Sequence, residues 1–169
     1  MGDHSETVQI DYDPGRITYG DLLDVFWKGH NPSYHSWSRQ YAAIIFYHNE
    51  EQKRLAQESK EQIASGLRGI VFTEIVPYTG FTLAEDYHQK HGLQHYHEFM
   101  QEIRRVYPSN REFVDSTAAA RLNGYLGGEG SYEFLAQELD SLGLSPTLKE
   151  RLREIVRRRT GSAVCPAPR

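Results

Sequence analysis

In the first half of the chain, continuous apolar segments alternate with amphipathic ones, which is typical of strands and helices that follow one another. Alternating apolar and polar residues predict a half-buried strand at 7–11. A continuous apolar run predicts a strand covered on both faces at 42–47. Residues 70–76 are predicted to form a third strand. Between the strands, apolar stripes at helical spacing predict helices at 18–29 and 49–66. The order β-α-β-α-β indicates a domain in which helices cover a sheet.

Capping residues support the beginnings of both helices. Thr18 is followed three positions later by Asp21, the spacing of a capping box. Asn49 stands directly before the second helical segment, and asparagine is a favoured N-cap because its side chain accepts a hydrogen bond from a free backbone N–H.

After Pro77 the pattern becomes helical. Apolar residues at helical spacing predict helices at 94–107, 116–126, 132–142 and 146–159. Ser145 followed by proline suits the beginning of the last helix. We expect residues 161–169 to form a frayed tail. The organisation is therefore an α/β half followed by a helical half.

Composition and charge exclude several classes of function. A net charge of −4 and a pI near 6.1 leave no wide basic surface, which argues against a general binder of nucleic acid. No apolar run approaches the length of a membrane span, and the first residues do not resemble a signal segment. One cysteine in 169 residues excludes an internal disulfide and a Cys-rich metal site. We expect a cytoplasmic protein.

The cysteine, Cys165, lies between apolar and proline residues near the end of the sequence. A cysteine nucleophile needs a base or a helix N-terminus to lower its pKa, and a rigid frame to orient it. The residues around Cys165 provide neither. An incidental exposed thiol is the simplest interpretation, and a thiol that forms a disulfide with another molecule is the alternative.

Four histidines occur within ten residues, and three of them have a spacing that can share one helical face. Gly92 interrupts that face, and no cysteine or acidic pair completes a known set of metal ligands. Surface or hydrogen-bonded histidines are the alternative to a metal site, and we expect no bound metal. The four are His88, His91, His95 and His97.

Glu6 and Tyr41 are candidates for a cleft because each stands where a predicted strand begins, and a rigid frame holds such side chains in place. The same positions suit plain rim residues. Glu85, Asp86 and His88 can likewise be ordinary residues at a helix start. Reasoning from residue patterns ends at an α/β domain without an obvious catalytic set.

The order of several segments is nevertheless specific. Seven spaced motifs occur between residues 2 and 90, and in this order they resemble the peptide methionine sulfoxide reductase A (MsrA) family. They are Gly2-Asp3-His4-Ser5-Glu6-Thr7-Val8-Gln9-Ile10-Asp11-Tyr12-Asp13-Pro14, Tyr19-Gly20-Asp21-Leu22-Leu23-Asp24-Val25-Phe26-Trp27, His30-Asn31-Pro32, Arg39-Gln40-Tyr41, Ala43-Ile44-Ile45-Phe46-Tyr47 with Glu50-Glu51-Gln52, Thr73-Glu74-Ile75, and Ala84-Glu85-Asp86-Tyr87-His88-Gln89.

This resemblance implies an α+β fold with a ferredoxin-like core over residues 1–90, a helical extension over 91–160 and a flexible tail over 161–169. It implies thiol-dependent reduction of methionine sulfoxide in oxidised proteins or peptides, without a bound cofactor and with thioredoxin or another thiol as electron donor. In the family a cysteine thiolate in a Gly-Cys-Phe-Trp motif attacks the sulfoxide sulfur. Glu6 matches the acid that protonates the oxygen, and Tyr41 matches one of the tyrosines that bind it.

The sequence departs from the family at several positions. The family's Gly-Cys-Phe-Trp motif precedes the first residue of this sequence, Ser36 stands where the family has an aspartate, and Ala42-Ala43 replaces Arg-Ser. Three explanations are open. The sequence is a fragment of a complete enzyme, or a non-catalytic relative that binds a partner or an oxidised peptide, or Cys165 has become the nucleophile.

Overall fold

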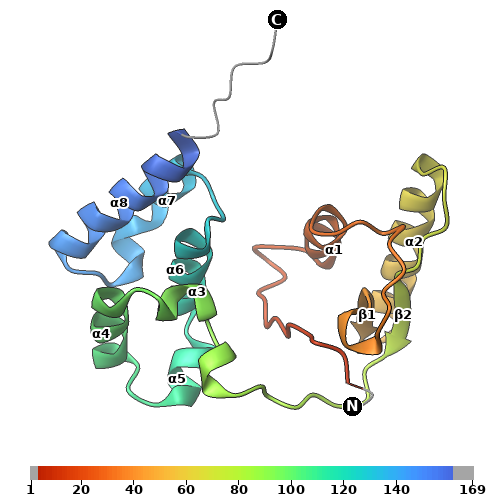
Figure 1. The fold of residues 1–169 in the computed structure, drawn as a ribbon, viewed down its shortest axis with the longest axis horizontal. Helices are drawn as coiled ribbons and strands as arrows, with labels where there is room; N and C mark the ends of the chain where they lie inside the picture. Colours follow the sequence, from red (N-terminus) through yellow and green to blue (C-terminus); the bar gives the residue numbers. More distant parts are fainter. Residues whose placement is uncertain (1–3, 162–169) are drawn as a thin grey trace, which may run out of the picture. The chain divides into compact units, whose positions relative to one another are not determined.

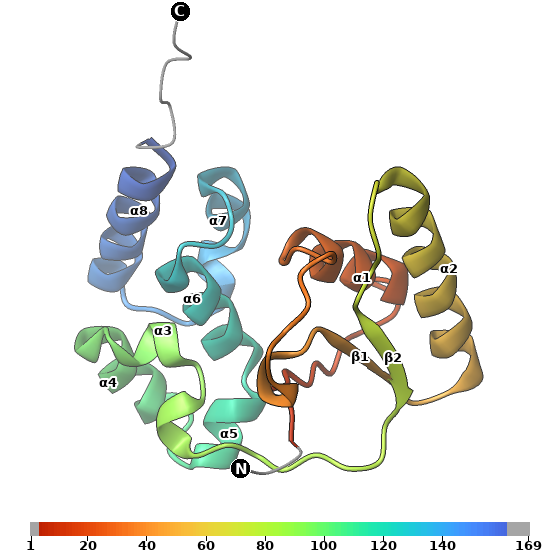
Figure 2. The same cartoon turned by 45° about the vertical axis from the view of Figure 1, so that its right-hand side comes forward.

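The computed structural model describes residues 4–161 of the 169-residue chain. The chain divides between Phe81 and Thr82 into two compact units, which Figures 1 and 2 trace in red to yellow-green and in green to blue. Each unit has its own hydrophobic core. The family-based boundary near residue 90 stays a prediction.

The first unit contains a two-stranded parallel sheet and two helices among its described residues. Strand β1 (Ile44–Tyr47) pairs with β2 (Glu74–Pro77), and Ile45 lies opposite Ile75. Helix α2 (Glu50–Gly66) connects the two strands, and α1 (Tyr19–Lys28) precedes them. Figure 2 shows the strands side by side. This arrangement, with the helical second unit, confirms the α+β class.

One face of this sheet is covered by the helices. The core there consists of buried apolar side chains from α1, β1, α2 and the segment before β2, namely Leu23, Trp27, Ile45, Ala56 and Val71. Because side chains alternate along a strand, the residues on either side of Ile45 and Ile75 belong to the opposite face. Phe72 and Glu74 are thus placed away from the helices, which agrees with their exposure.

Both predicted helix starts are confirmed. The Thr18 hydroxyl accepts a hydrogen bond from the Asp21 N–H at 3.1 Å, and the Asp21 carboxylate accepts one from the Thr18 N–H at 2.8 Å. The Asn49 side chain accepts a hydrogen bond from the Gln52 N–H at 2.8 Å. These signals could be found in the sequence because a cap is complete within four residues.

The predicted strand at 7–11 is wrong. This part of the described chain has no strand structure, and its apolar side chains, Val8 and Ile10, are 82% and 56% exposed. The run at 42–47 yields the shorter β1, of which only Ile45 is buried, so it is not covered on both faces. Alternation shows that a segment suits a strand, but a strand also needs a neighbour that supplies hydrogen bonds. The predicted sheet of three strands is thus a two-stranded parallel one in the described residues.

A buried polar network joins both helices to the segment that leads into β2. The His30 Nδ1 donates to the Phe26 carbonyl at 2.7 Å, and the His30 Nε2 is hydrogen-bonded to the Thr73 hydroxyl at 3.1 Å. The Lys60 ammonium donates to the Thr73 carbonyl at 2.6 Å. Thr73 has no exposed surface, so these contacts replace the water that it would otherwise bind.

The second unit is helical. The four predicted helices are confirmed as α4 (His97–Val106), α6 (Thr117–Gly127), α7 (Tyr132–Glu138) continued by η3 (Leu139–Leu142), and α8 (Pro146–Gly161). Helices α3 (His91–Gln94) and α5 (Asn110–Asp115) were not predicted. Ser109, directly after Pro108, begins α5 through a capping box with Glu112. Figure 1 shows α7 and α8 side by side. The unit also contains the short helix η2 (Asp86–His88).

The helices of the second unit surround one core and approach closely at one glycine. Phe99, Phe113, Leu122 and Leu135 are among its buried side chains. Gly92 of α3 lies against α6, where an added Cβ would be 3.2 Å from the Asn123 carbonyl oxygen and 3.4 Å from the Gly127 Cα. This glycine therefore has a packing role.

We expect Thr73→Val to lower the free energy of unfolding of the first unit by about 1–3 kcal/mol, because it leaves the His30 Nε2 without its partner. Both tryptophans of the chain, Trp27 and Trp37, lie in this unit, so urea unfolding followed by tryptophan fluorescence reports on it. Thr7→Val, at an exposed threonine, is the matched control with an expected change within about 0.5 kcal/mol. Equal stability of the two variants would contradict the role of the network.

In the second unit we expect Gly130→Ala to be destabilising by at least about 1–2 kcal/mol. Gly130 has a φ of +83°, and an added Cβ would lie 2.8 Å from the Tyr125 ring, whose hydroxyl is held at 2.7 Å from Glu138. Burial and this hydrogen bond raise the pKa of Tyr125, so the hydroxyl remains the donor. Gly124→Ala is the control. Gly124 lies in a helix with open space around it, so we expect the substitution to raise the free energy of unfolding by about 0.5–1 kcal/mol. Far-UV circular dichroism during thermal unfolding measures both.

Candidate active site

The N-terminal segment of the described chain runs beside the residues that precede Tyr41. The Ser5 hydroxyl donates to the Arg39 carbonyl at 2.8 Å, and the Glu6 N–H donates to the Gln40 carbonyl at 2.9 Å. The Gln40 side-chain amide donates to the Glu6 carboxylate at 2.7 Å. The structure therefore holds Glu6 against the residue next to Tyr41.

Neither residue begins a strand, in contrast to the sequence-based expectation. Glu6 precedes a segment without strand structure, and Tyr41 is the last residue of the short helix η1 (Arg39–Tyr41), after which β1 begins at Ile44. Glu6 is exposed, and the Tyr41 side chain is 53% exposed. The Tyr41 ring lies 5.8 Å from the ring of Trp37.

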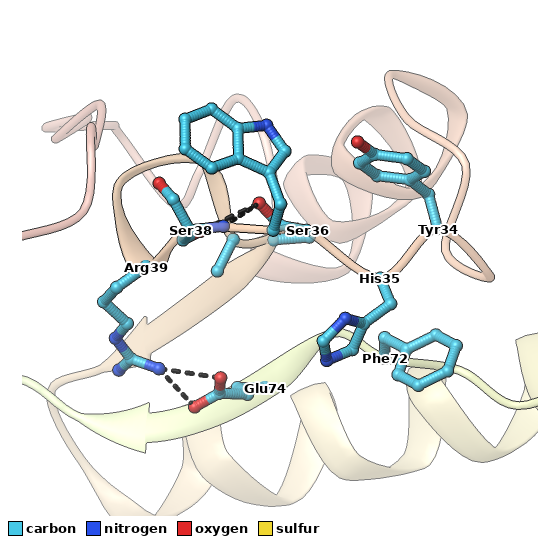
Figure 3. Close-up of a pocket in the computed structure, with 10 residues that line it drawn as sticks. Tyr34, His35, Ser36, Ser38, Arg39, Phe72 and Glu74 are labelled. Atoms are coloured by element: carbon cyan, nitrogen blue, oxygen red, sulfur yellow. Dashed lines mark hydrogen bonds and ion pairs between the residues drawn. The ribbon is translucent and has the colours of Figure 1, made fainter.

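A cavity of about 420 Å³ lies next to these residues. It is formed by the loop before η1, the first residue of η1, the two residues before β1, and the segment that leads into and begins β2. Its lining residues are Tyr34, His35, Ser36, Trp37, Ser38, Arg39, Ala42, Ala43, Phe72 and Glu74. Figure 3 shows these side chains above β2, with the His35 ring beside Phe72. The two rings are 4.9 Å apart in an edge-on arrangement.

The charges of the cavity neutralise each other. One guanidinium nitrogen of Arg39 lies 2.7 Å from each Glu74 carboxylate oxygen, and both interactions are drawn in Figure 3. Both side chains are partly exposed, so the pair adds little to stability. Its effect is on recognition, because the cavity contains a cation and an anion that are already paired.

Ser36, which replaces the aspartate of the MsrA pattern, forms its hydrogen bonds within its own turn. Its hydroxyl donates to the Ser38 carbonyl at 2.8 Å and accepts from the Ser38 N–H at 3.3 Å. These bonds shape the turn that leads from the cavity into η1. Ser36 therefore supplies no carboxylate to the site.

The other candidates do not form a site within the described residues. His91 and His95 have rings 4.5 Å apart, and His97 contacts Gln101, but no group of three or more His, Cys, Asp or Glu side chains in the described part of the chain can hold a metal ion. Cys165 lies outside the described residues. No helix within residues 4–161 is long and apolar enough to cross a membrane.

Comparison with known families gives the decisive observation. The family model described as peptide methionine sulfoxide reductase matches residues 1–122, which is more than half of the chain. The chain belongs to this family. A second model, the helical domain of selenoprotein methionine sulfoxide reductase A, matches residues 109–157. The match covers the chain from α5 through most of α8, so the helical unit also has a counterpart within the MsrA family.

Individual relatives agree with this assignment. A peptide methionine sulfoxide reductase of Drosophila melanogaster is 40% identical over 152 residues, covering 89% of this chain and 61% of the relative. MsrA of Methanosarcina acetivorans is 45% identical over 95 residues, covering 52% and 50%. Peptide methionine sulfoxide reductase A5 of Arabidopsis thaliana is 35% identical over 164 residues, covering 94% and 60%. The chain thus spans about half to three fifths of the length of these MsrA relatives.

Residue patterns did not reveal the cavity or Trp37. The loop at 34–38 has the composition of a turn, and lining residues separated by more than thirty positions meet only when β1 pairs with β2. One signal was present in the sequence: a tryptophan within a polar loop, four residues before the MsrA-type tyrosine. Tryptophan is mostly buried in proteins, so an exposed one in this position indicates a contact surface.

The two tryptophans should differ sharply in accessibility. Trp37 is 76% exposed, whereas Trp27 is 7% exposed and donates its indole N–H to Ser59 at 3.0 Å. We expect acrylamide to quench the fluorescence of a Trp27→Phe variant, which retains Trp37, severalfold more steeply than that of a Trp37→Phe variant. Similar quenching constants would contradict the exposed position of Trp37.

Proposed function

We propose that this chain carries the oxygen-binding side of a thiol-dependent methionine sulfoxide reductase, a peptide-methionine (S)-S-oxide reductase that repairs oxidised proteins. The supporting observation is the hydrogen bonding of Glu6 to Gln40, which keeps a carboxyl group against the residue adjacent to Tyr41. In the MsrA resemblance these two positions are the proton donor and an oxygen-binding tyrosine.

The chemistry of a sulfoxide explains why this pair is useful. The oxygen leaves sulfur only when it is protonated, so a carboxylic acid within hydrogen-bond reach lowers the barrier. In this proposal Glu6 donates that proton and the Tyr41 hydroxyl donates a hydrogen bond to the same oxygen. Both side chains are exposed in the described chain, so the cover that keeps the acid neutral comes from another segment or from the substrate.

The electrons come from a thiol. A thiol attacks the sulfoxide sulfur, the oxygen is transferred, and the products are the thioether and a sulfenic acid. The thiol sulfur is oxidised by two electrons, and the sulfoxide sulfur is reduced by the same two electrons. A second thiol condenses with the sulfenic acid to give a disulfide and water. We propose thioredoxin or another cellular thiol as the final donor, in a reducing cytoplasm.

A non-catalytic binding protein is the second candidate. It differs from the first candidate in the nucleophile, because the cysteine among these 169 residues, Cys165, lies outside the MsrA motifs. Translation of the coding DNA directly upstream, in the same reading frame, separates the two candidates. A Gly-Cys-Phe-Trp motif there supports the reductase, and its absence supports the binding protein.

We expect the 169-residue chain to show no dithiothreitol-dependent reduction of a peptide containing methionine S-sulfoxide. Fusion behind the Gly-Cys-Phe-Trp segment of another MsrA should produce reduction, because the fusion supplies the nucleophile. In that fusion, Glu6→Gln should lower kcat/KM by about 10²–10⁴-fold, the typical contribution of general acid catalysis. Formation of the thioether peptide, followed by chromatography, measures each rate.

The controls test each assignment separately. Cys→Ser in the supplied motif should abolish reduction by the fusion, and Glu133→Gln, at an exposed acid of the helical unit, should leave it unchanged. Reduction by the unfused chain that disappears in Cys165→Ser would instead identify Cys165 as the nucleophile. Full activity of Glu6→Gln would show that another group supplies the proton.

A further inference from the structure

Trp37 lies between the Tyr41 ring and the cavity. Its ring lies 5.8 Å from the Tyr41 ring, and its side chain also lines the cavity on the outer face of the sheet. It is 76% exposed although it carries the largest apolar surface of any side chain type. Nothing among the described residues requires a tryptophan here for packing, because the core of this unit is complete without it.

The cavity selects an uncharged side chain. Its two charged residues, Arg39 and Glu74, are bonded to each other, while Tyr34, His35, Trp37 and Phe72 provide aromatic or imidazole walls. Its volume of about 420 Å³ lies in the range of pockets that take small organic groups. A second anion or cation would compete with the existing ion pair, whereas an apolar group leaves it intact.

The spacing relates this cavity to Tyr41. In an extended peptide, side chains two residues apart point to the same side and are separated by about 7 Å. The Trp37 ring lies 5.8 Å from the Tyr41 ring and also lines the cavity, so one side chain stands between Tyr41 and the cavity. A step of two residues is the shortest that keeps two side chains of an extended peptide on the same side. A peptide whose methionine sulfoxide contacts Tyr41 can therefore place the side chain two residues away on the other side of the indole.

We infer that Trp37 separates two substrate subsites, one for methionine sulfoxide at Tyr41 and one, the cavity, for a bulky apolar side chain two residues away in the same polypeptide. This inference rests on the proposed function. It names the substrate class as unfolded or extended segments in which methionine sulfoxide and an aromatic or large aliphatic residue have this spacing. Trp37 is in this account a specificity-determining residue and takes no part in proton transfer.

Binding of defined peptides to the full chain tests the inference, and it requires no turnover. The probes are Ac-Phe-Gly-Met(O)-Gly-Phe-NH2 and Ac-Gly-Gly-Met(O)-Gly-Gly-NH2 as S-sulfoxides, the acidic analogue with Asp in place of Phe, and the Phe peptide with unoxidised methionine. Isothermal titration calorimetry gives each Kd. We expect the Phe sulfoxide peptide to bind about tenfold more tightly than the Gly peptide, and the acidic one no better than the Gly peptide.

Variants assign the preference to residues. Phe72→Ala, which changes only the cavity, should reduce the tenfold preference for the Phe peptide to about twofold and leave the Kd of the Gly peptide unchanged. Trp37→Ala should remove the preference, and Trp37→Phe should restore part of it because an aromatic wall remains. Tyr41→Phe should weaken discrimination between sulfoxide and thioether without changing the preference for the flanking residue. Phe134→Ala, at an exposed phenylalanine of the helical unit, is the control.

The outcomes separate this inference from the proposed function. If wild type prefers sulfoxide over thioether but binds Phe and Gly peptides equally, or if Trp37→Ala keeps the preference, the subsite is refuted and the proposed function stands. Tighter binding of the acidic peptide also refutes the apolar subsite. If wild type does not distinguish sulfoxide from thioether, the proposed function fails and the inference fails with it.

Discussion

The hydrogen bond between His30 and the buried Thr73 is the constraint on which the arrangement of the first unit depends. His30 follows α1, Thr73 precedes β2, and Lys60 of α2 reaches the carbonyl of the same threonine. Three elements are thus fixed at one residue that has no exposed surface. Because strand side chains alternate, a threonine fixed toward the helices places its two neighbours on the other face of the sheet. Those neighbours, Phe72 and Glu74, are walls of the cavity, so the orientation of the cavity follows from a polar contact in the core.

The parts of the fold that could be predicted are those determined by neighbouring residues. Capping at Thr18 and Asn49 needs only a few consecutive positions, and so does the apolar periodicity of α1, α2 and the helices of the second unit. The segment at 7–11 has a suitable local pattern and yet is no strand, because strand formation depends on a partner elsewhere in the chain. Val8 and Ile10 therefore remain exposed. Alternation in a sequence shows that a segment can form a strand, but it does not show that another strand lies beside it.

The site shows the same distinction. Glu6 and Tyr41 could be selected because the MsrA resemblance assigns both positions, and the structure adds the Gln40 contact that brings their segments together. The cavity could not be predicted, because Arg39 and Glu74 meet only through the pairing of β1 with β2. For the histidines of the second unit, the sequence suggested a site that the described residues do not form. Their spacing suggested a shared face, but Gly92 lies between them where α3 approaches α6, and packing explains that glycine without any ligand.

A carboxyl group and a phenol can polarise a sulfoxide, but neither can reduce it, because both electrons must come from sulfur or another reductant. In the function proposed above, the thiol reaches the sulfoxide sulfur from a direction that Tyr41 and Glu6 leave open while both contact the oxygen. The exposed positions of Glu6, Tyr41 and Trp37 agree with this requirement, since a site already closed over them would exclude both the thiol and a polypeptide substrate. Closure then comes with the thiol-bearing segment and the substrate, and it excludes water at the moment when a neutral carboxylic acid is needed. In such an arrangement the protein can bind an oxidised segment before the thiol arrives, so that substrate recognition and electron supply are carried by separate surfaces.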